Sequence, residues 1–223
     1  MTIEPIAYFH SPLMSKFGIP RQSGLAATLP GRIVFTPDYR REEAVRGLEG
    51  FDYLWLIWEF SSSGAVGALT VRPPRLGGNE RVGVFASRSP YRPNSLGLSC
   101  VKLLRVDYND ALAPVLYVSG ADLVDGTPIY DVKPYLPFAD AVPGAVGGFA
   151  DGVAGQRLRV KYAADPAGLP EALLLQLTEV LAGDPRPHYQ NDPERVYAFE
   201  FAGYHVEFTC AADLLTVTNL TKI

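Results

Sequence analysis

Short apolar segments recur along the first two thirds of the 223-residue chain, with glycine and proline between them. β-Branched and aromatic residues are frequent in these segments, which favours strands. Only 41–48 has a helical pattern in this region. Many strands without regular intervening helices predict a mainly β fold, a barrel or a sandwich, and argue against a doubly wound sheet. The expected strands are Ile3–His10, Arg32–Thr36, Tyr53–Phe60, Arg81–Arg88, Gly97–Asp107, Val115–Ala121 and Pro128–Leu136.

One of these segments, YLWLIWEF (53–60), is apolar at both alternating sets of positions. A strand of this kind is typically covered on both faces. We therefore expect a core on its inner side and a helix, a loop or a partner subunit on its outer side.

The character of the chain changes near Ala139. The stretch FADAVPGAVGGFADGVAG (138–155) is rich in glycine and is expected to be a linker or a long loop. Beyond it, Pro170–Ala182 has the pattern of an amphipathic helix, with Gly183 just after its end. The segments VYAFEF, YHVEFTC and LLTVTNL then predict an antiparallel meander. We expect a β-barrel domain over residues 1–142 and a small α+β domain over residues 143–223.

Composition excludes several classes of protein. Nearly half of the residues are apolar and a fifth are charged, as in ordinary globular domains. Cys100 and Cys210 lie in apolar segments, which favours reduced thiols. The N-terminus lacks the features of a signal peptide, and the longest apolar run is too short for a membrane helix. We expect a cytoplasmic protein with no membrane segment.

Common catalytic motifs are absent from the sequence. It contains no GxxxxGK[ST] loop, no GxGxxG between a strand and a helix, no GxSxG and no HExxH. The three histidines are scattered, so no metal site is expected. Cys100 as the nucleophile of a hydrolase is one alternative, although its apolar surroundings favour a buried thiol.

Charge is distributed unevenly along the chain. The net charge is −4, but residues 72–105 hold seven basic side chains and one acidic one. A local basic patch on an acidic body is compatible with a polyanion site. The alternative is a set of ordinary solvated arginines.

Four polar loops combine proline, glycine and charged residues: KFGIPRQSGL (16–25), VRPPRLGGNERVG (71–83), SRSPYRPNSLG (87–97) and ADLVDGTPIYDVKPYLPF (121–138). Proline makes a loop rigid, and glycine lets the backbone approach a ligand closely. Arginine offers a planar fork that binds phosphate. Together the loops favour a nucleotide or nucleic-acid site, without indicating a reaction.

These loops, together with AVRGLEGFDYLWLIWEF (44–60), resemble in order and spacing the signature blocks of the TsaA-like, or TrmO, family. GDPRPHYQNDPERVYAFEF (183–201) is similar to the second domain of bacterial members. The resemblance implies a dimeric β-barrel methyltransferase that uses S-adenosylmethionine without a Rossmann fold. The implied substrate is N6-threonylcarbamoyladenosine at position 37 of tRNA, methylated on N6. The implied cofactor site lies in the β-domain near the subunit interface.

The resemblance also implies site residues. The family's cofactor-contacting stretches fall on Ser23, Gly24, Leu25, Ser61, Ser62, Arg92, Gly126, Thr127, Pro128 and Ile129. Two departures affect these loops. Ser23 stands where the family commonly has the proline of Gln-Pro-Gly, and Ser95 stands where it commonly has that of Asn-Pro-Ile-Gly.

Catalytic and substrate-binding roles remain more open. Asp125, Asp131 and Lys133 are candidates for shifting electron density onto N6, and a set of salt bridges at a strand end is the alternative. The substrate-binding candidates are Arg21, Arg72, Arg75, Arg88, Asn94, Tyr135 and Arg186. Two other functions stay open: an RNA-binding module without catalysis, and a methyltransferase with a different acceptor.

Overall fold

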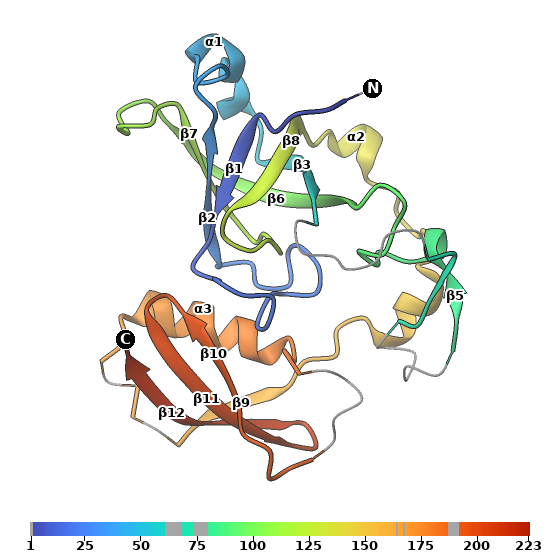
Figure 1. Cartoon of the computed structure of the whole chain (residues 1–223), viewed down its shortest axis with the longest axis vertical. Coiled ribbons are helices and arrows are strands. Elements are labelled where there is room, and N and C mark those ends of the chain that lie inside the picture. The colour runs from blue at the N-terminus through green and yellow to red at the C-terminus, as the bar shows by residue number, and fades with distance from the viewer. Residues whose placement is uncertain (1, 61–67, 74–79, 164, 167, 187–191) are drawn as a thin grey trace.

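The structure is a computed structural model that describes residues 2–60, 68–73, 80–163, 165–166, 168–186 and 192–223. Six antiparallel strands form a closed barrel in the order β1-β2-β7-β6-β3-β8 (Figure 1). Closure pairs every strand on both sides and leaves no free sheet edge. The expected mainly β fold with a barrel is confirmed. The barrel strands are β1 (Ala7–His10), β2 (Pro30–Phe35), β3 (Tyr53–Glu59), β6 (Leu96–Asp107), β7 (Val115–Ser119) and β8 (Thr127–Pro134).

A second sheet follows in the last third of the chain, with the order β10-β11-β12-β9. The expected meander is confirmed as β10 (Tyr197–Phe201), β11 (Tyr204–Ala211) and β12 (Leu214–Lys222). Its first turn uses Ala202 and Gly203, both at positive φ. The sequence did not predict β9 (Arg159–Tyr162), which pairs parallel to β12 at the edge. The expected helix is α3 (Glu171–Ala182).

Short elements fill the connections, and two expectations fail there. Arg81–Arg88 is not one strand: β5 (Val82–Gly83) pairs only with β4 (Thr70–Val71), and a 3-10 turn, η3 (Val84–Ala86), follows. The helix expected at 41–48 is a single turn, α1 (Glu42–Val45), because Gly47 has a positive φ that ends it. The other short elements are η1 (Leu48–Gly50), α2 (Pro137–Asp140) and η4 (Gly148–Val153).

The apolar strand β3 alternates between inside and outside. Leu54, Leu56 and Trp58 are buried in the barrel. On the outer face Trp55 is half-buried, and its indole N–H donates to Asp140 of α2 at 3.0 Å. The expectation of cover on both faces is therefore met in part, since the outer face is only half covered.

Two apolar cores organise the chain. One fills the barrel, and the other lies between the second sheet and α3. The second core also includes Leu13, Ala26 and Leu29, which lie on the connection between β1 and β2. Since α3 lies between its own sheet and the barrel (Figure 1), the two units share part of their packing. No helix in the described ranges has the length and apolarity needed to cross a bilayer.

Gly31 tests the packing of the barrel. A Cβ added there would lie 2.2 Å from Cζ of Phe9, which is a buried core ring. We expect Gly31→Ala to lower the free energy of unfolding by about 1–3 kcal/mol, the usual cost of overpacking a core. Gly50→Ala is the control, because nothing lies within 4 Å of the added Cβ there. Urea denaturation measures both variants, and equal losses of stability would contradict this packing.

Candidate active site

A cavity of ≈440 Å³ lies at one end of the barrel. The end of β3, the start of β6 and the segment that leads into β8 form part of its wall, and loops 16–25 and 87–97 contribute the rest. Its volume falls within the range of about 300–1,000 Å³ that is typical of small-molecule and cofactor sites. The lining residues are Lys16, Ile19, Pro20, Arg21, Gln22, Trp58, Glu59, Phe60, Ser87, Arg88, Pro90, Arg92, Leu96, Gly97, Leu98, Asp122, Leu123, Val124 and Thr127.

A chain of hydrogen bonds connects the barrel core to this cavity. Nε1–H of Trp58 donates to Oγ of Ser99 at 2.9 Å, and Oγ–H of Ser99 donates to Oδ1 of Asp122 at 2.5 Å. Ser99 is fully buried, and Trp58 is nearly so. The indole packs against Gly97, where an added Cβ would lie 2.3 Å from Cε2 of the ring. The carboxylate of Asp122 is therefore fixed by Ser99, which is itself held by the tightly packed indole of Trp58.

Asp122 has an unusual electrostatic environment. Burial raises the pKa of its carboxyl, while the hydrogen bond from Ser99 and the positive charge of Arg88 act in the opposite direction. A carboxylate with a raised pKa in a cavity is a candidate for proton transfer. Our sequence-based prediction left Asp122 out of the catalytic set. The available signal was an acidic residue close behind an apolar strand, which also fits an ordinary loop.

The arginines of loop 87–97 hold the loops in place. Nη1–H of Arg88 donates to Oε1 of Gln22 at 2.5 Å, which connects the two polar loops of the cavity. Nη1–H of Arg92 donates to the carbonyl oxygen of Ser87 at 2.6 Å, within its own loop. Both arginines line the cavity, as expected of residues that bind cofactor or substrate.

The two serines that replace family prolines each have a local role. Oγ of Ser23 accepts the backbone N–H of Cys100 at 3.2 Å, which ties loop 16–25 to β6. The backbone N–H of Ser95 donates to the carbonyl oxygen of Arg92, and its φ is +22°. A proline ring can neither donate this bond nor adopt this φ. Here the loops are held by hydrogen bonds instead of by proline rings.

None of the three predicted catalytic residues lines the cavity. Oδ1 of Asp125 accepts hydrogen bonds from Nδ1 of His10 at 3.2 Å and from the backbone N–H of Ser11 at 3.0 Å. Asp131 and Lys133 form an exposed ion pair with 2.9 Å between Oδ2 and Nζ. The geometry corresponds to the alternative of structural salt bridges.

The other predicted site residues lie at several different places in the structure. Thr127 lines the cavity, while Ile129 belongs to the barrel core. Tyr135 packs on Trp55 at the outside of the barrel, with ring centroids 5.8 Å apart. The predicted residues that border the cavity loops or lie on the surface without lining the cavity are Ser23, Gly24, Leu25, Arg72, Asn94, Gly126 and Pro128. Ser61, Ser62 and Arg75 lie outside the described residues.

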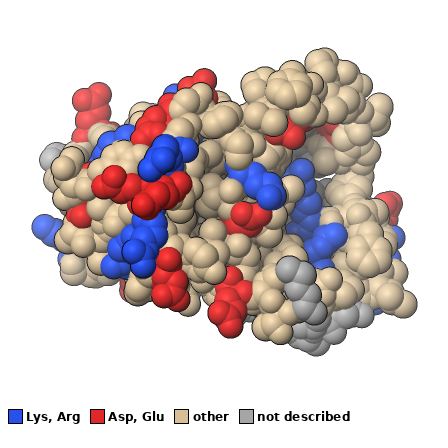
Figure 2. Space-filling model, turned by 90° about the horizontal axis from the view of Figure 1, so that it is seen from above, with Lys and Arg blue, Asp and Glu red and all other residues tan. Residues whose placement is uncertain are grey.

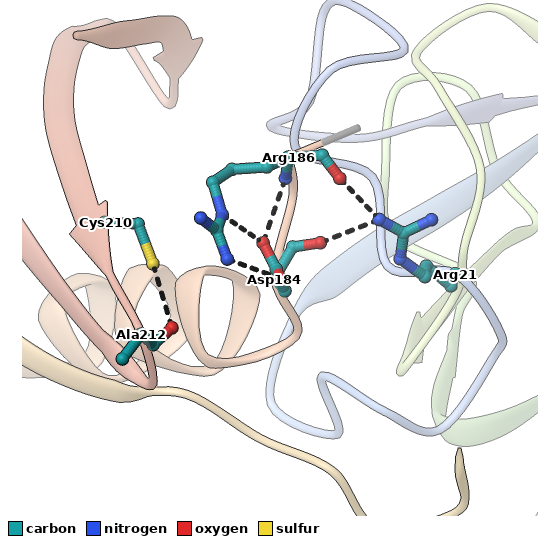
Figure 3. A network of polar contacts seen from close by, with 5 residues as sticks. All are labelled: Arg21, Asp184, Arg186, Cys210 and Ala212. Carbon is teal, nitrogen blue, oxygen red and sulfur yellow. Dashed lines mark hydrogen bonds and ion pairs between the residues drawn. The ribbon is translucent and has the colours of Figure 1, made fainter. Parts of the chain in front are cut away.

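Arg21 and Arg186 join the two units (Figure 3). The guanidinium of Arg186 binds the carboxylate of Asp184 with two hydrogen bonds, at 2.9 and 3.1 Å, and its side chain is buried. Nη2 of Arg21 donates to the carbonyl oxygens of Asp184 and Arg186 at 3.0 and 2.7 Å. This arrangement commits Arg186 to internal contacts, so the structure gives it a supporting role instead of the predicted phosphate contact.

Three further features concern alternative sites: the charged surface, the cysteines and the arrangement of potential metal ligands. Lys and Arg gather in a recess of the face seen in Figure 2, and Asp and Glu are interspersed with them elsewhere. Burial raises the pKa of Cys100, and this residue does not line the cavity, which argues against a nucleophilic thiol. Within the described ranges, no group of three or more His, Cys, Asp or Glu side chains is arranged to hold a metal ion.

The contact between Arg21 and the second unit can be tested by mutation. Arg21→Ala removes the donors of two carbonyl oxygens, so we expect the free energy of unfolding to fall by about 1–3 kcal/mol. Arg159→Ala is the control, since its ion pair with Asp213 is exposed and its loss should leave stability nearly unchanged. Chemical denaturation compares the two variants. An Arg21→Ala protein as stable as the control would contradict the contact.

Comparisons with known proteins show the family to which the chain is similar. The model of the tRNA-methyltransferase O N-terminal domain matches residues 8–141, and that of the TrmO C-terminal domain matches residues 156–223. The tRNA (adenine(37)-N6)-methyltransferase of Escherichia coli is 40% identical over 217 residues, covering 92% of this chain and 91% of the relative.

Two further matches come from Pseudomonas aeruginosa. A protein with the provisional name S-adenosylmethionine-dependent methyltransferase RcsF is 41% identical over 216 residues, with 88% of this chain and 87% of the relative covered. A crystal structure of TrmO superposes with a TM-score of 0.80 at 32% identity, over 100% of this chain and 97% of the other.

Proposed function

The chain belongs to the tRNA-methyltransferase O family, and we propose that it transfers a methyl group from S-adenosylmethionine to N6 of the adenosine at position 37 of tRNA. The observation that carries this proposal is that every described residue lining the cavity lies within the matched segment 8–141. The Escherichia coli relative, whose name states this activity, is aligned with 92% of this chain.

The residues of the cavity fit the methyl donor. Arg88 and Lys16, which line the cavity, are proposed to bind its carboxylate, and Glu59 is proposed to bind its ammonium group. Trp58, Phe60 and Leu98 offer apolar surface to its adenine, with the rings of Trp58 and Phe60 only 4.3 Å apart. S-adenosylmethionine supplies an electrophilic methyl group on a positively charged sulfur. The chain's own task is to hold N6 in line with that methyl group, where orientation can lower the barrier by up to about 7–11 kcal/mol.

We further propose that the accepted adenosine carries N6-threonylcarbamoyl, as the family resemblance implies. Position 37 lies in the anticodon loop, where the base is unpaired, so the cost of flipping it out of a duplex is largely avoided. Arg72, an exposed residue of the basic segment 72–105, is proposed to bind the tRNA backbone. Binding should then weaken as salt concentration rises.

Several features of the organisation belong to this proposal. Residues 1–142 form the unit that binds the donor, in which Gly24, Gly126 and their neighbours shape the loops, and residues 143–223 support it. The enzyme works without a metal, in the cytoplasm, as a homodimer. Leu98 and Leu104, on one outward face of β6, are 56% and 52% exposed, which supports a partner at this face.

A methyl-transfer assay tests the function. Labelled S-adenosylmethionine is incubated with the protein and with tRNA that carries or lacks the threonylcarbamoyl group. We expect label only in the modified tRNA, at N6 of position 37, by mass spectrometry of the nucleosides. Label in both tRNAs would indicate a different acceptor. Binding of tRNA without binding of the donor in calorimetry would leave only an RNA-binding module.

A further inference from the structure

Asp122 lies in the wall of the cavity, on the segment that leads into β8. Glu59 is the other carboxylate in that wall, and its Oε2 already accepts a hydrogen bond from the hydroxyl of Tyr130 at 2.5 Å. Resting on the proposed function, we propose that Asp122 is the catalytic base that takes the proton from N6 during methyl transfer.

The hydrogen-bond chain fixes one oxygen of this carboxylate. Ser99 donates to Oδ1, and Ser99 in turn accepts from Trp58, so the carboxylate cannot rotate without breaking a buried bond. The backbone N–H groups of Ser23 and of Asp122 itself also donate to this carboxylate. Asp122 is half-buried because it opens onto the cavity. The carboxylate is therefore held in place by several donors, and because its two oxygens offer about four lone-pair sites, it can still accept a proton from a ligand in the cavity.

The acceptor needs such a base. N6 of a threonylcarbamoylated adenosine belongs to a ureido group, in which its lone pair is delocalised. N6 forms a bond to the methyl carbon as the sulfur–carbon bond breaks with its electron pair left on sulfur, and the N6 proton passes to the carboxylate of Asp122. The carboxylic acid then releases this proton to solvent. Charge and atoms balance without any further reactant.

The surroundings adjust Asp122 for this role. Burial raises the pKa of its carboxyl, which makes the carboxylate a stronger base than a surface aspartate. The hydrogen bond from Ser99 and the charge of Arg88 limit that rise. The charged groups that share the cavity are Lys16 and Arg21 from loop 16–25, Arg88 and Arg92 from loop 87–97, and Glu59 at the end of β3.

The first test separates proton transfer from donor binding. Asp122→Asn keeps the shape and the acceptor for Ser99 but removes the base. We expect the single-turnover rate of methyl transfer to fall by about 10²-fold or more, the usual contribution of a general base. The Kd of S-adenosylhomocysteine in calorimetry should stay within about threefold of the wild type. Asp38→Asn, on the exposed surface far from the cavity lining, is the matched control for both measurements.

The second test uses Ser99→Ala and pH. Loss of the Ser99 hydrogen bond should raise the pKa of Asp122 further, so the acid limb of the rate–pH profile should move to higher pH. A 13C-NMR titration of the Asp122 carboxyl in the free protein should move in the same direction, independently of activity. If Asp122→Asn does not fold, this pair of measurements still decides the role.

Distinct outcomes would overturn the proposal. A rate for Asp122→Asn within threefold of the wild type would remove the base. A loss of S-adenosylhomocysteine binding as large as the loss of rate would make Asp122 a donor-binding residue instead. An unmoved acid limb in Ser99→Ala would contradict the coupling. If the wild type itself transfers no methyl group to tRNA, the proposed function fails, and this result is distinct from all three.

Discussion

The hydrogen bonds from Trp58 through Ser99 to Asp122 connect the core of the barrel to the cavity, and the chemistry proposed for the site depends on them. Their members come from β3, from β6, which pairs with both β3 and β7, and from the segment after β7. Ser99 is fully buried and Trp58 nearly so, so loss of the hydrogen bond between them would leave an unsatisfied polar group at a cost of about 1–3 kcal/mol. The same contacts that stabilise the fold therefore position the carboxylate.

The second unit contacts loop 16–25 on the side that faces away from the cavity. Phe17 and Ile19 of that loop pack against the second core, while Lys16 and Gln22 line the cavity. Arg21 donates to two carbonyl oxygens beyond α3, and Gln22 accepts from Arg88. Within the described residues, the C-terminal unit thus supports one wall of the cavity without lining it.

The spacing of apolar residues and the positions of glycine and proline were enough to predict the fold class, the meander and α3, because these depend on local sequence patterns. They could not predict β9, whose parallel pairing with β12 depends on a partner more than 50 residues away. Among the site residues, the family resemblance placed Arg92 and Thr127 at the cavity. Asp122 was missed because what sets it apart is its contact with Ser99 and, through Ser99, with Trp58. These residues are distant in the sequence, so the residues next to Asp122 do not reveal that it is buried.

The chain's two tryptophans allow a direct test of the claim that this cavity receives the methyl donor. Trp58 lines the cavity, whereas Trp55 lies on the outer face beside Asp140. In a Trp55→Phe variant, the fluorescence of Trp58 is followed while S-adenosylhomocysteine is added. We expect the fluorescence of Trp58 to change until it saturates, with a midpoint equal to the Kd measured by calorimetry. Binding detected by calorimetry with no change in Trp58 fluorescence would contradict it.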